Sequence, residues 1–149
     1  MNVFINEAKQ MSDKKLVHVM RQAIRWGDMD VFGHVNNTVY FRYMESGRIA
    51  FLEQAAGDLD LQVAGPVLVT AHCSFLRQLK YPGEIEIRTF ASSPGRSSFE
   101  VTHEIRMVDA DGNAEVVHAE GGGKVVWIDF AAEKSVPLPE RVRELLPAG

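Results

Sequence analysis

The sequence predicts a single α+β domain in which an antiparallel sheet packs against one long helix. Several segments alternate apolar and polar residues, which is typical of strands. Residues 38–56 instead repeat apolar residues every three or four positions, which is typical of a helix. The connections between the later strands are too short for the crossover that parallel pairing requires, so the strands are predicted to be antiparallel.

The composition fits one globular domain spanning residues 1–149. Hydrophobic residues make up 46% of the 149 residues and charged residues 24%, which favours a buried core over a disordered chain. No apolar run reaches the roughly 18 residues of a membrane span, and residues 1–15 lack the pattern of a secretory signal, so we expect a cytoplasmic protein without a membrane partner. A net charge of −4 argues against nucleic acid as a partner. The single cysteine, Cys73, excludes an intrachain disulfide.

The N-terminal third predicts a strand, a loop and the long helix. Residues 16–26 alternate, and the apolar face of this strand carries Leu16, Met20, Ile24 and Trp26. Residues 27–37 are rich in Gly, Asp and Asn and predict a loop. The helix over 38–56 has Asn36 or Asn37 as its cap and Gly57 as its end.

The helix is more apolar than a surface helix, so the rest of the chain is expected to wrap around it. Gly47 lies in its interior, where a glycine costs about 1 kcal/mol relative to alanine. We therefore expect a neighbouring backbone to approach the helix closely at Gly47.

Four further strands and a short helix follow. A strand is predicted over 67–79, after Pro66, and one of its faces carries Val67, Val69, Ala71, Cys73 and Phe75. Turns at 81–83, 92–98 and 111–113 each precede a further strand. The first two of these strands lie near 84–88 and 99–107, and the last ends near Phe130 and is predicted to be broken by the glycines at 121–123. Pro139 can open a short helix over 139–146.

The residues best suited to catalysis lie directly before the long helix: Asp28, Asp30, His34, Asn36 and Asn37. A helix N-terminus offers unpaired N–H groups and a positive dipole end, which suit a developing oxyanion. A nearby carboxylate can attack an acyl group or activate water. Loop and cap residues alone also produce this pattern, so spacing leaves both interpretations open.

The other reactive side chains favour structural roles. Asp28, Asp30 and His34 are of a type that can share a metal ion, but no second ligand cluster is evident, and we expect no metal. His103 lies on an apolar strand face and is predicted to be a hydrogen-bonded core residue. Cys73 has apolar neighbours and is predicted to be a small hydrophobe rather than a reactive thiolate.

Residues 24–53, IRWGDMDVFGHVNNTVYFRYMESGRIAFLE, resemble the hot-dog-fold acyl-CoA thioesterases of the 4-hydroxybenzoyl-CoA thioesterase family. Residues 74–86, SFLRQLKYPGEIE, are similar to a later segment of that family. The resemblance covers a core of about residues 16–130 and implies a hot-dog fold, a five-stranded antiparallel sheet wrapped around one long central helix. It further implies hydrolysis of an acyl-CoA thioester without a cofactor, by a homodimer or homotetramer with sites between subunits.

The resemblance also implies roles for individual residues. Asp30 matches the catalytic carboxylate, Asn37 supplies a backbone N–H to the thioester carbonyl, and His34 is a positioning group. The resemblance assigns the phosphates of CoA to Arg96 with Ser97 and Ser98, with Arg88 as a weaker candidate, and the acyl group to Phe32, Tyr40 and Met44.

Several alternatives remain at this point. Asp30 can act as a nucleophile or as a general base. A non-catalytic module that binds acyl-CoA or acyl-carrier protein on the same fold is the alternative function. The histidine patterns of hot-dog dehydratases are absent from the sequence, and a pure scaffold would need no carboxylate at the helix start.

Overall fold

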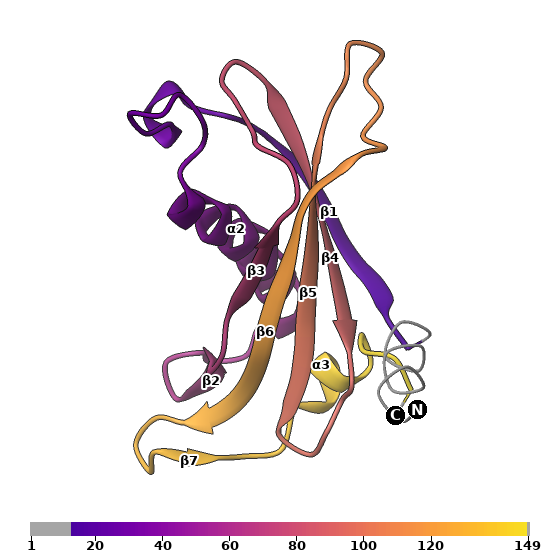
Figure 1. Cartoon of the computed structure of the whole chain (residues 1–149). Coiled ribbons are helices and arrows are strands. Elements are labelled where there is room, and N and C mark those ends of the chain that lie inside the picture. The colour runs from indigo at the N-terminus through magenta and orange to yellow at the C-terminus, as the bar shows by residue number, and fades with distance from the viewer. Residues whose placement is uncertain (1–12, 149) are drawn as a thin grey trace, which may run out of the picture.

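The computed structural model describes residues 13–148. The expectation of no secretory signal concerns residues 1–15, of which residues 1–12 lie outside the described residues. An antiparallel sheet curls along the long helix α2 (Figure 1). The elements are β1 (Lys15–Ala23), η1 (Trp26–Asp28), α2 (Asn37–Ala56), β2 (Ala64–Leu68), β3 (His72–Phe75), β4 (Glu84–Ser92), β5 (Ser98–Met107), β6 (Val117–Asp129), β7 (Lys134–Ser135) and α3 (Glu140–Arg143). None of the helices in the described part of the chain is both long and apolar enough to span a bilayer.

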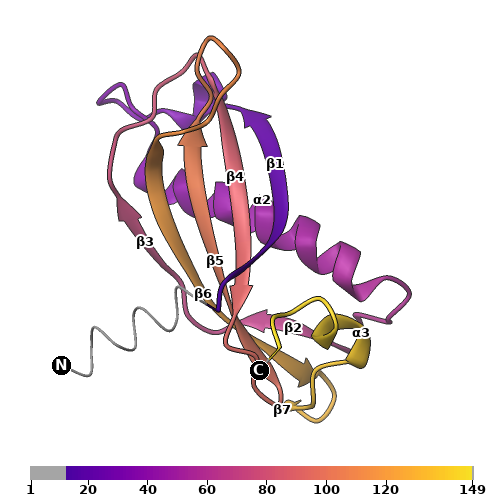
Figure 2. The same ribbon diagram turned by 90° about the vertical axis from the view of Figure 1, so that its right-hand side faces the viewer.

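The strand order is β1-β4-β5-β6-β2, and β3 and β7 also pair with β6. Every pair is antiparallel, which confirms the predicted α+β class. Figure 2 shows α2 crossing one face of the sheet. The buried side chains between these two layers include Tyr43, Phe51, Ile87, Phe99 and Ile105.

The sheet holds seven strands rather than the predicted five. The segment predicted as one strand over 67–79 forms β2 and β3, and the chain leaves the ladder between Val69 and Ala71. The predicted common apolar face is therefore wrong, since Val69 is 49% exposed and Phe75 is 42% exposed. The additional strand β7 pairs with the end of β6.

The glycine run at 121–123 does not break β6, in contrast to the prediction. β6 continues through it and pairs with β5 on one side and β3 on the other. A Cβ on Gly121 would collide with the carbonyl oxygen of His72, and one on Gly122 with the carbonyl oxygen of Val101. The backbones of β3 and β5 therefore lie too close to β6 for any residue with a Cβ at Gly121 or Gly122.

The limits of α2 follow the prediction closely. The Asn36 side chain accepts a hydrogen bond from the Thr38 N–H at 2.9 Å, as an N-cap does. Gly57 ends the helix with a φ of 54°. Gly47 does lie at a close approach, but to side chains rather than to a backbone: an added Cβ would lie 2.7 Å from Thr89 Oγ1.

Two terminal elements differ from the prediction. β1 has an irregularity between Leu16 and His18, which leaves Leu16 49% exposed, whereas Ile24 is buried as predicted. Trp26 lies in η1, beyond the strand, and is 74% exposed. The C-terminal helix α3 is shorter than the predicted 139–146, although Val142 packs into the core as expected.

Candidate active site

The loop before α2 is a closed hairpin. A bridge between Met29 and Val35 joins its two sides. Inside it the Asp30 N–H donates to the His34 carbonyl at 3.0 Å, and Gly33 turns the chain with a φ of 82°. Only a residue without a Cβ adopts this backbone conformation easily. The hairpin thus fixes the position of Asp30 relative to the helix start.

The Asp30 carboxylate is held by two donors. Its Oδ1 accepts a hydrogen bond from the Phe32 N–H at 2.9 Å, and its Oδ2 accepts one from Asn36 Nδ2 at 3.2 Å. Asn36 therefore uses its amide nitrogen to orient Asp30 and its amide oxygen to cap α2. The carboxylate and the helix start are linked through this single side chain.

The first turn of α2 presents one free donor. The N–H groups of Asn36, Thr38 and Val39 all have acceptors within 3.0 Å. The Asn37 N–H has no hydrogen-bond partner among residues 13–148. It lies at the positive end of the helix dipole, where an oxyanion is stabilised.

Asp30 and Asn37 line the same cavity, of about 490 Å³. Its volume is within the range of small-molecule sites. The lining also includes His34, Phe32 and Tyr40 on the side of the loop and α2, and residues 75–78, from the end of β3 onward, on the other side.

Tyr40 holds these two sides together. Its hydroxyl accepts a hydrogen bond from the Leu79 N–H at 3.1 Å and donates to the Arg77 carbonyl at 3.4 Å. Burial raises the pKa of Tyr40, so the hydroxyl stays protonated at neutral pH.

Asp28, two residues before Asp30, has a structural environment. Its Oδ2 accepts hydrogen bonds from the Tyr43 hydroxyl at 2.7 Å and from the Arg25 N–H at 2.9 Å. Burial and the neighbouring Asp28 carboxylate raise the pKa of Tyr43, which keeps this proton on the phenol. Within residues 13–148 no three His, Cys, Asp or Glu side chains gather as metal ligands would.

The structure brings together Asp30, His34, Asn37, Phe32 and Tyr40 from the predicted site. Met44, predicted beside the same acyl group, is buried and lines a different cavity. The predicted phosphate contacts Arg96, Ser97 and Ser98 lie at the β4–β5 turn, at the opposite end of the sheet (Figure 1). β4, whose nine residues span about 30 Å, begins after the segment that lines the cavity at 75–78 and ends at that turn.

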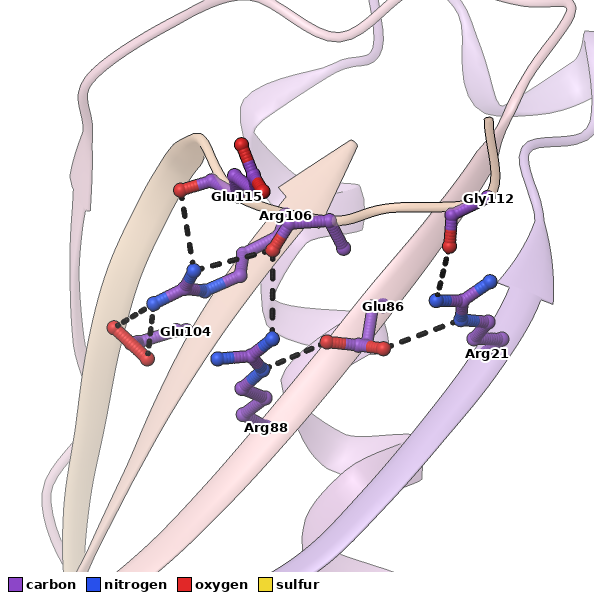
Figure 3. A network of polar contacts seen from close by, with 8 residues as sticks. Arg21, Glu86, Arg88, Glu104, Arg106, Gly112 and Glu115 are labelled. Atoms are coloured by element: carbon purple, nitrogen blue, oxygen red, sulfur yellow. Dashed lines mark hydrogen bonds and ion pairs between the residues drawn. The ribbon is translucent and has the colours of Figure 1, made fainter. Parts of the chain in front are cut away.

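Arg88 also lies away from the cavity, in a network on the sheet face that faces away from α2 (Figure 3). Its Nε donates to Glu86 Oε2 at 2.7 Å, and Arg21 Nε donates to Glu86 Oε1 at 3.2 Å. Burial opposes the charge of Glu86, but the hydrogen bonds from Arg88 and Arg21 outweigh it and lower the pKa of this carboxyl. Arg88 is therefore paired with a carboxylate outside the cavity, and its contact with a CoA phosphate stays a prediction.

Arg77, to which no role was assigned from sequence patterns, also lines the cavity. It lies within the segment SFLRQLKYPGEIE that carries the family resemblance, so the segment was identified but not its part in the site. Arg77 is exposed and is the one arginine or lysine among the described residues that line this cavity.

Comparison with known proteins gives consistent matches. A model of the thioesterase-like superfamily matches residues 24–146. The solved structure of PA2801, a proposed thioesterase from Pseudomonas aeruginosa, is 33% identical with a TM-score of 0.79, over 87% of this chain and 98% of that chain. A thioesterase from Thermus thermophilus, crystallised with coenzyme A and zinc, is 29% identical with a TM-score of 0.73, over 90% of this chain and 100% of that chain.

A curated relative, the uncharacterised protein YsmA of Bacillus subtilis (strain 168), is 30% identical over 76 residues. That match covers 51% of this chain and 52% of YsmA. The chain therefore spans about half the length of this curated relative.

Proposed function

The chain belongs to the thioesterase-like superfamily, and from this premise we propose that it hydrolyses acyl-CoA thioesters in the cavity at the start of α2. The observation that carries the proposal is that Asp30 and Asn37 line one cavity of about 490 Å³, with the Asn37 N–H free of any partner among residues 13–148. The family assignment agrees with the resemblance to hot-dog-fold thioesterases, and the CoA-bound Thermus thermophilus relative supports a CoA thioester as substrate.

In the proposed mechanism the thioester carbonyl oxygen accepts a hydrogen bond from the Asn37 N–H. The dipole of α2 stabilises the negative charge that develops on this oxygen. Asp30 then attacks the carbonyl carbon, which expels the CoA thiolate and leaves a mixed anhydride for water to hydrolyse, or it removes a proton from an attacking water. His34 acts as a positioning residue, since its carbonyl accepts the hydrogen bond of the Asp30 N–H.

The CoA moiety carries phosphates that require cations. We assign one contact to Arg77, which lines the cavity of its own chain. Because the β4–β5 turn lies at the opposite end of the sheet from this cavity, we assign Arg96, Ser97 and Ser98 to the CoA bound by a second copy. The proposed active unit is therefore a homodimer or a larger homo-oligomer.

Apolar exposure on one side of the chain supports such an assembly. β3 pairs with β6 alone among the strands in the described part of the chain, so its other edge is open. Phe41 and Ile49 of α2 are 38% and 45% exposed, and Leu76 beyond β3 is 52% exposed. A second copy would cover these side chains next to the cavity.

A thiol-release assay on an acyl-CoA panel tests the proposal. The wild-type protein should release free CoA, and Asp30→Asn should lower kcat by about 100-fold or more while the protein still binds the substrate. Asp58→Asn, which alters an exposed aspartate beyond α2, is the matched control and should keep full activity. Binding without hydrolysis by the wild-type protein would favour the alternative, a non-catalytic acyl-binding module.

A single turnover in ¹⁸O-labelled water tests the nucleophilic route for Asp30. Label found in the Asp30 carboxylate would reject a pure general-base role, because solvent oxygen enters that carboxylate only when water opens the anhydride at the Asp30 Cγ.

A further inference from the structure

A second cavity, of about 290 Å³, lies along α2 beside the proposed active site. The two cavities are neighbours, since Phe41 lines the second and its ring contacts the ring of Phe75, which lines the first, with centroids 6.4 Å apart. Met44 and Leu68 give the second cavity an apolar wall. An acyl chain that enters past Phe41 would therefore find a lining suited to methylene groups.

The second cavity also holds an arginine that has no hydrogen-bond or ion-pair partner among residues 13–148. Glu45, the one carboxylate among the described residues that line this cavity, forms an ion pair with Arg42, whose Nη1 lies 3.3 Å from Glu45 Oε1. The guanidinium of Arg48 also lines the cavity, and it makes no hydrogen bond or ion pair with any residue from 13 to 148. Burial lowers the pKa of Arg48 and the nearby Glu45 carboxylate opposes this shift, and an arginine side chain remains charged at neutral pH.

Next to it lies a buried imidazole with a free nitrogen. His103 is 1% exposed, and its Nδ1 lies 2.9 Å from Thr89 Oγ1. Its Nε2 has no partner among the described residues. With the Thr89 hydroxyl as donor to Nδ1, the hydrogen of the neutral ring is on Nε2, and the cavity then contains a buried donor without an acceptor.

A carboxylate satisfies both groups at once. It pairs with the Arg48 guanidinium and accepts a hydrogen bond from His103 Nε2, whereas a methyl group would leave both unpaired. Arg48 follows Asn37 by three turns of α2, about 16 Å along the axis. Side chains on a helix tilt toward its N-terminus, so the guanidinium reaches back toward the thioester.

We propose that this cavity binds the far carboxylate of an acyl group whose thioester lies at Asn37, so that the preferred substrates are CoA monothioesters of medium-chain dicarboxylic acids. The inference rests on the proposed function and deepens it by naming the acyl class. Arg48 and His103 are then specificity residues that take no part in the reaction at the thioester.

Matched acyl-CoA pairs test the proposal directly. Adipyl-CoA is compared with hexanoyl-CoA, and suberyl-CoA with octanoyl-CoA, because each pair differs only in a terminal carboxylate or methyl group. We expect kcat/KM to favour the acid by about tenfold to a hundredfold, the range of a hydrogen-bonded ion pair. Equal values, or a preference for the methyl-terminated substrates, would overturn it.

Arg48 variants identify the origin of that preference. Arg48→Met should bring the acid-to-methyl ratio of kcat/KM close to one, and Arg48→Lys should retain part of it because the charge remains. Lys134→Met removes an exposed cation on β7 and should leave the ratio unchanged. A full preference in Arg48→Met would contradict the assignment of Arg48.

A binding experiment separates failure of this inference from failure of the proposed function. Free adipate should move the ¹⁵N resonance of His103 Nε2 in the wild-type protein, adipamide should not, and the exposed His72 is the internal reference. A His103 response without hydrolysis of any acyl-CoA would support the carboxylate site and reject the activity. Hydrolysis without an acid preference and without a His103 response would support the activity and reject the site.

Discussion

The Tyr43 hydroxyl donates a 2.7 Å hydrogen bond to Asp28 Oδ2 and so joins the buried face of α2 to the loop that carries Asp30. The backbone of Asp28 makes a second link, since its carbonyl accepts a hydrogen bond from the Asn36 N–H at 3.0 Å. The helix core, the loop and the helix cap are therefore one connected unit, although neither Tyr43 nor Asp28 lines the Asp30 cavity.

Tyr43→Phe should weaken this unit without altering the cavity lining. Loss of the hydroxyl leaves the Asp28 carboxylate short of one donor, so we expect the free energy of unfolding to fall by about 1–3 kcal/mol. We also expect kcat to fall, because Asp30 is held less firmly. Urea unfolding and the thiol-release assay measure the two effects. Tyr81→Phe, at an exposed tyrosine, is the control, and equal behaviour of the two variants would show that the Tyr43 bond is unimportant.

Asn36 has two roles that two substitutions can separate. Asn36→Ser keeps an N-cap oxygen for α2 but removes the amide donor to Asp30, whereas Asn36→Ala removes both. Both variants should lose activity to a similar extent, at least several-fold in kcat/KM. Asn36→Ala alone should lose about 1 kcal/mol of stability in urea unfolding. Full activity in Asn36→Ser would show that the bond to Asp30 does not matter.

The stability of the protein should depend on pH through His103. Burial, and to a lesser extent the charge of Arg48, lower the pKa of His103 to about 3. An unfolded histidine has a pKa near 6.5, so between these values the unfolded chain binds a proton that the folded chain does not. The free energy of unfolding therefore falls as pH falls below 6.5, by up to about 1.4 kcal/mol per pH unit.

Urea unfolding at pH 7.5 and pH 4.5 measures this effect. The wild-type protein should lose about 2–3 kcal/mol more between the two values than His103→Gln, which has no titrating group. His72→Gln, at an exposed histidine, should retain the wild-type dependence. The comparison uses differences between pH values, so a lower overall stability of His103→Gln does not affect it. The same pH dependence in all three proteins would contradict the neutral, buried state of His103.

A single charge in the proposed subunit interface should separate the copies. Ile49→Glu places a carboxylate among the exposed apolar side chains of α2, outside both cavities. We expect light scattering after gel filtration to show a mass reduced to that of one chain, with loss of activity. Val116→Glu alters an equally exposed residue in the β5–β6 connection and should keep the mass of the assembly. A wild-type protein with the mass of one chain would reject the assembly itself.

Local sequence patterns correctly predicted the strands in which buried and exposed side chains alternate without interruption. On β5, Phe99, Val101, His103 and Ile105 are all buried, as strict alternation requires. Alternation failed in β1 because an irregularity after Leu16 changes which side chains face the core. It failed again over 67–79, because the apolar pattern does not show where a strand loses its hydrogen-bonding partner.

The site was predictable where its parts are adjacent in sequence. Asp30 and Asn37 belong to one loop and one helix start, so their proximity follows from local structure. Arg77 joins them through long-range hydrogen bonds to the segment 77–79, from the Tyr40 hydroxyl and from the Val35 N–H, which no local pattern reveals. Arg48 and His103 lie on different elements, and only the packing of β5 against α2 places both on one cavity.

The glycine run of β6 has an evolutionary consequence. Gly122 lines the cavity of Arg48 and His103, yet any side chain added there would strike the backbone of β5. Mutation of Gly122 can therefore hardly reshape this wall, and divergence of substrate range among descendants of this chain should be recorded in the other lining residues, those of α2 together with Leu68 and Ala71.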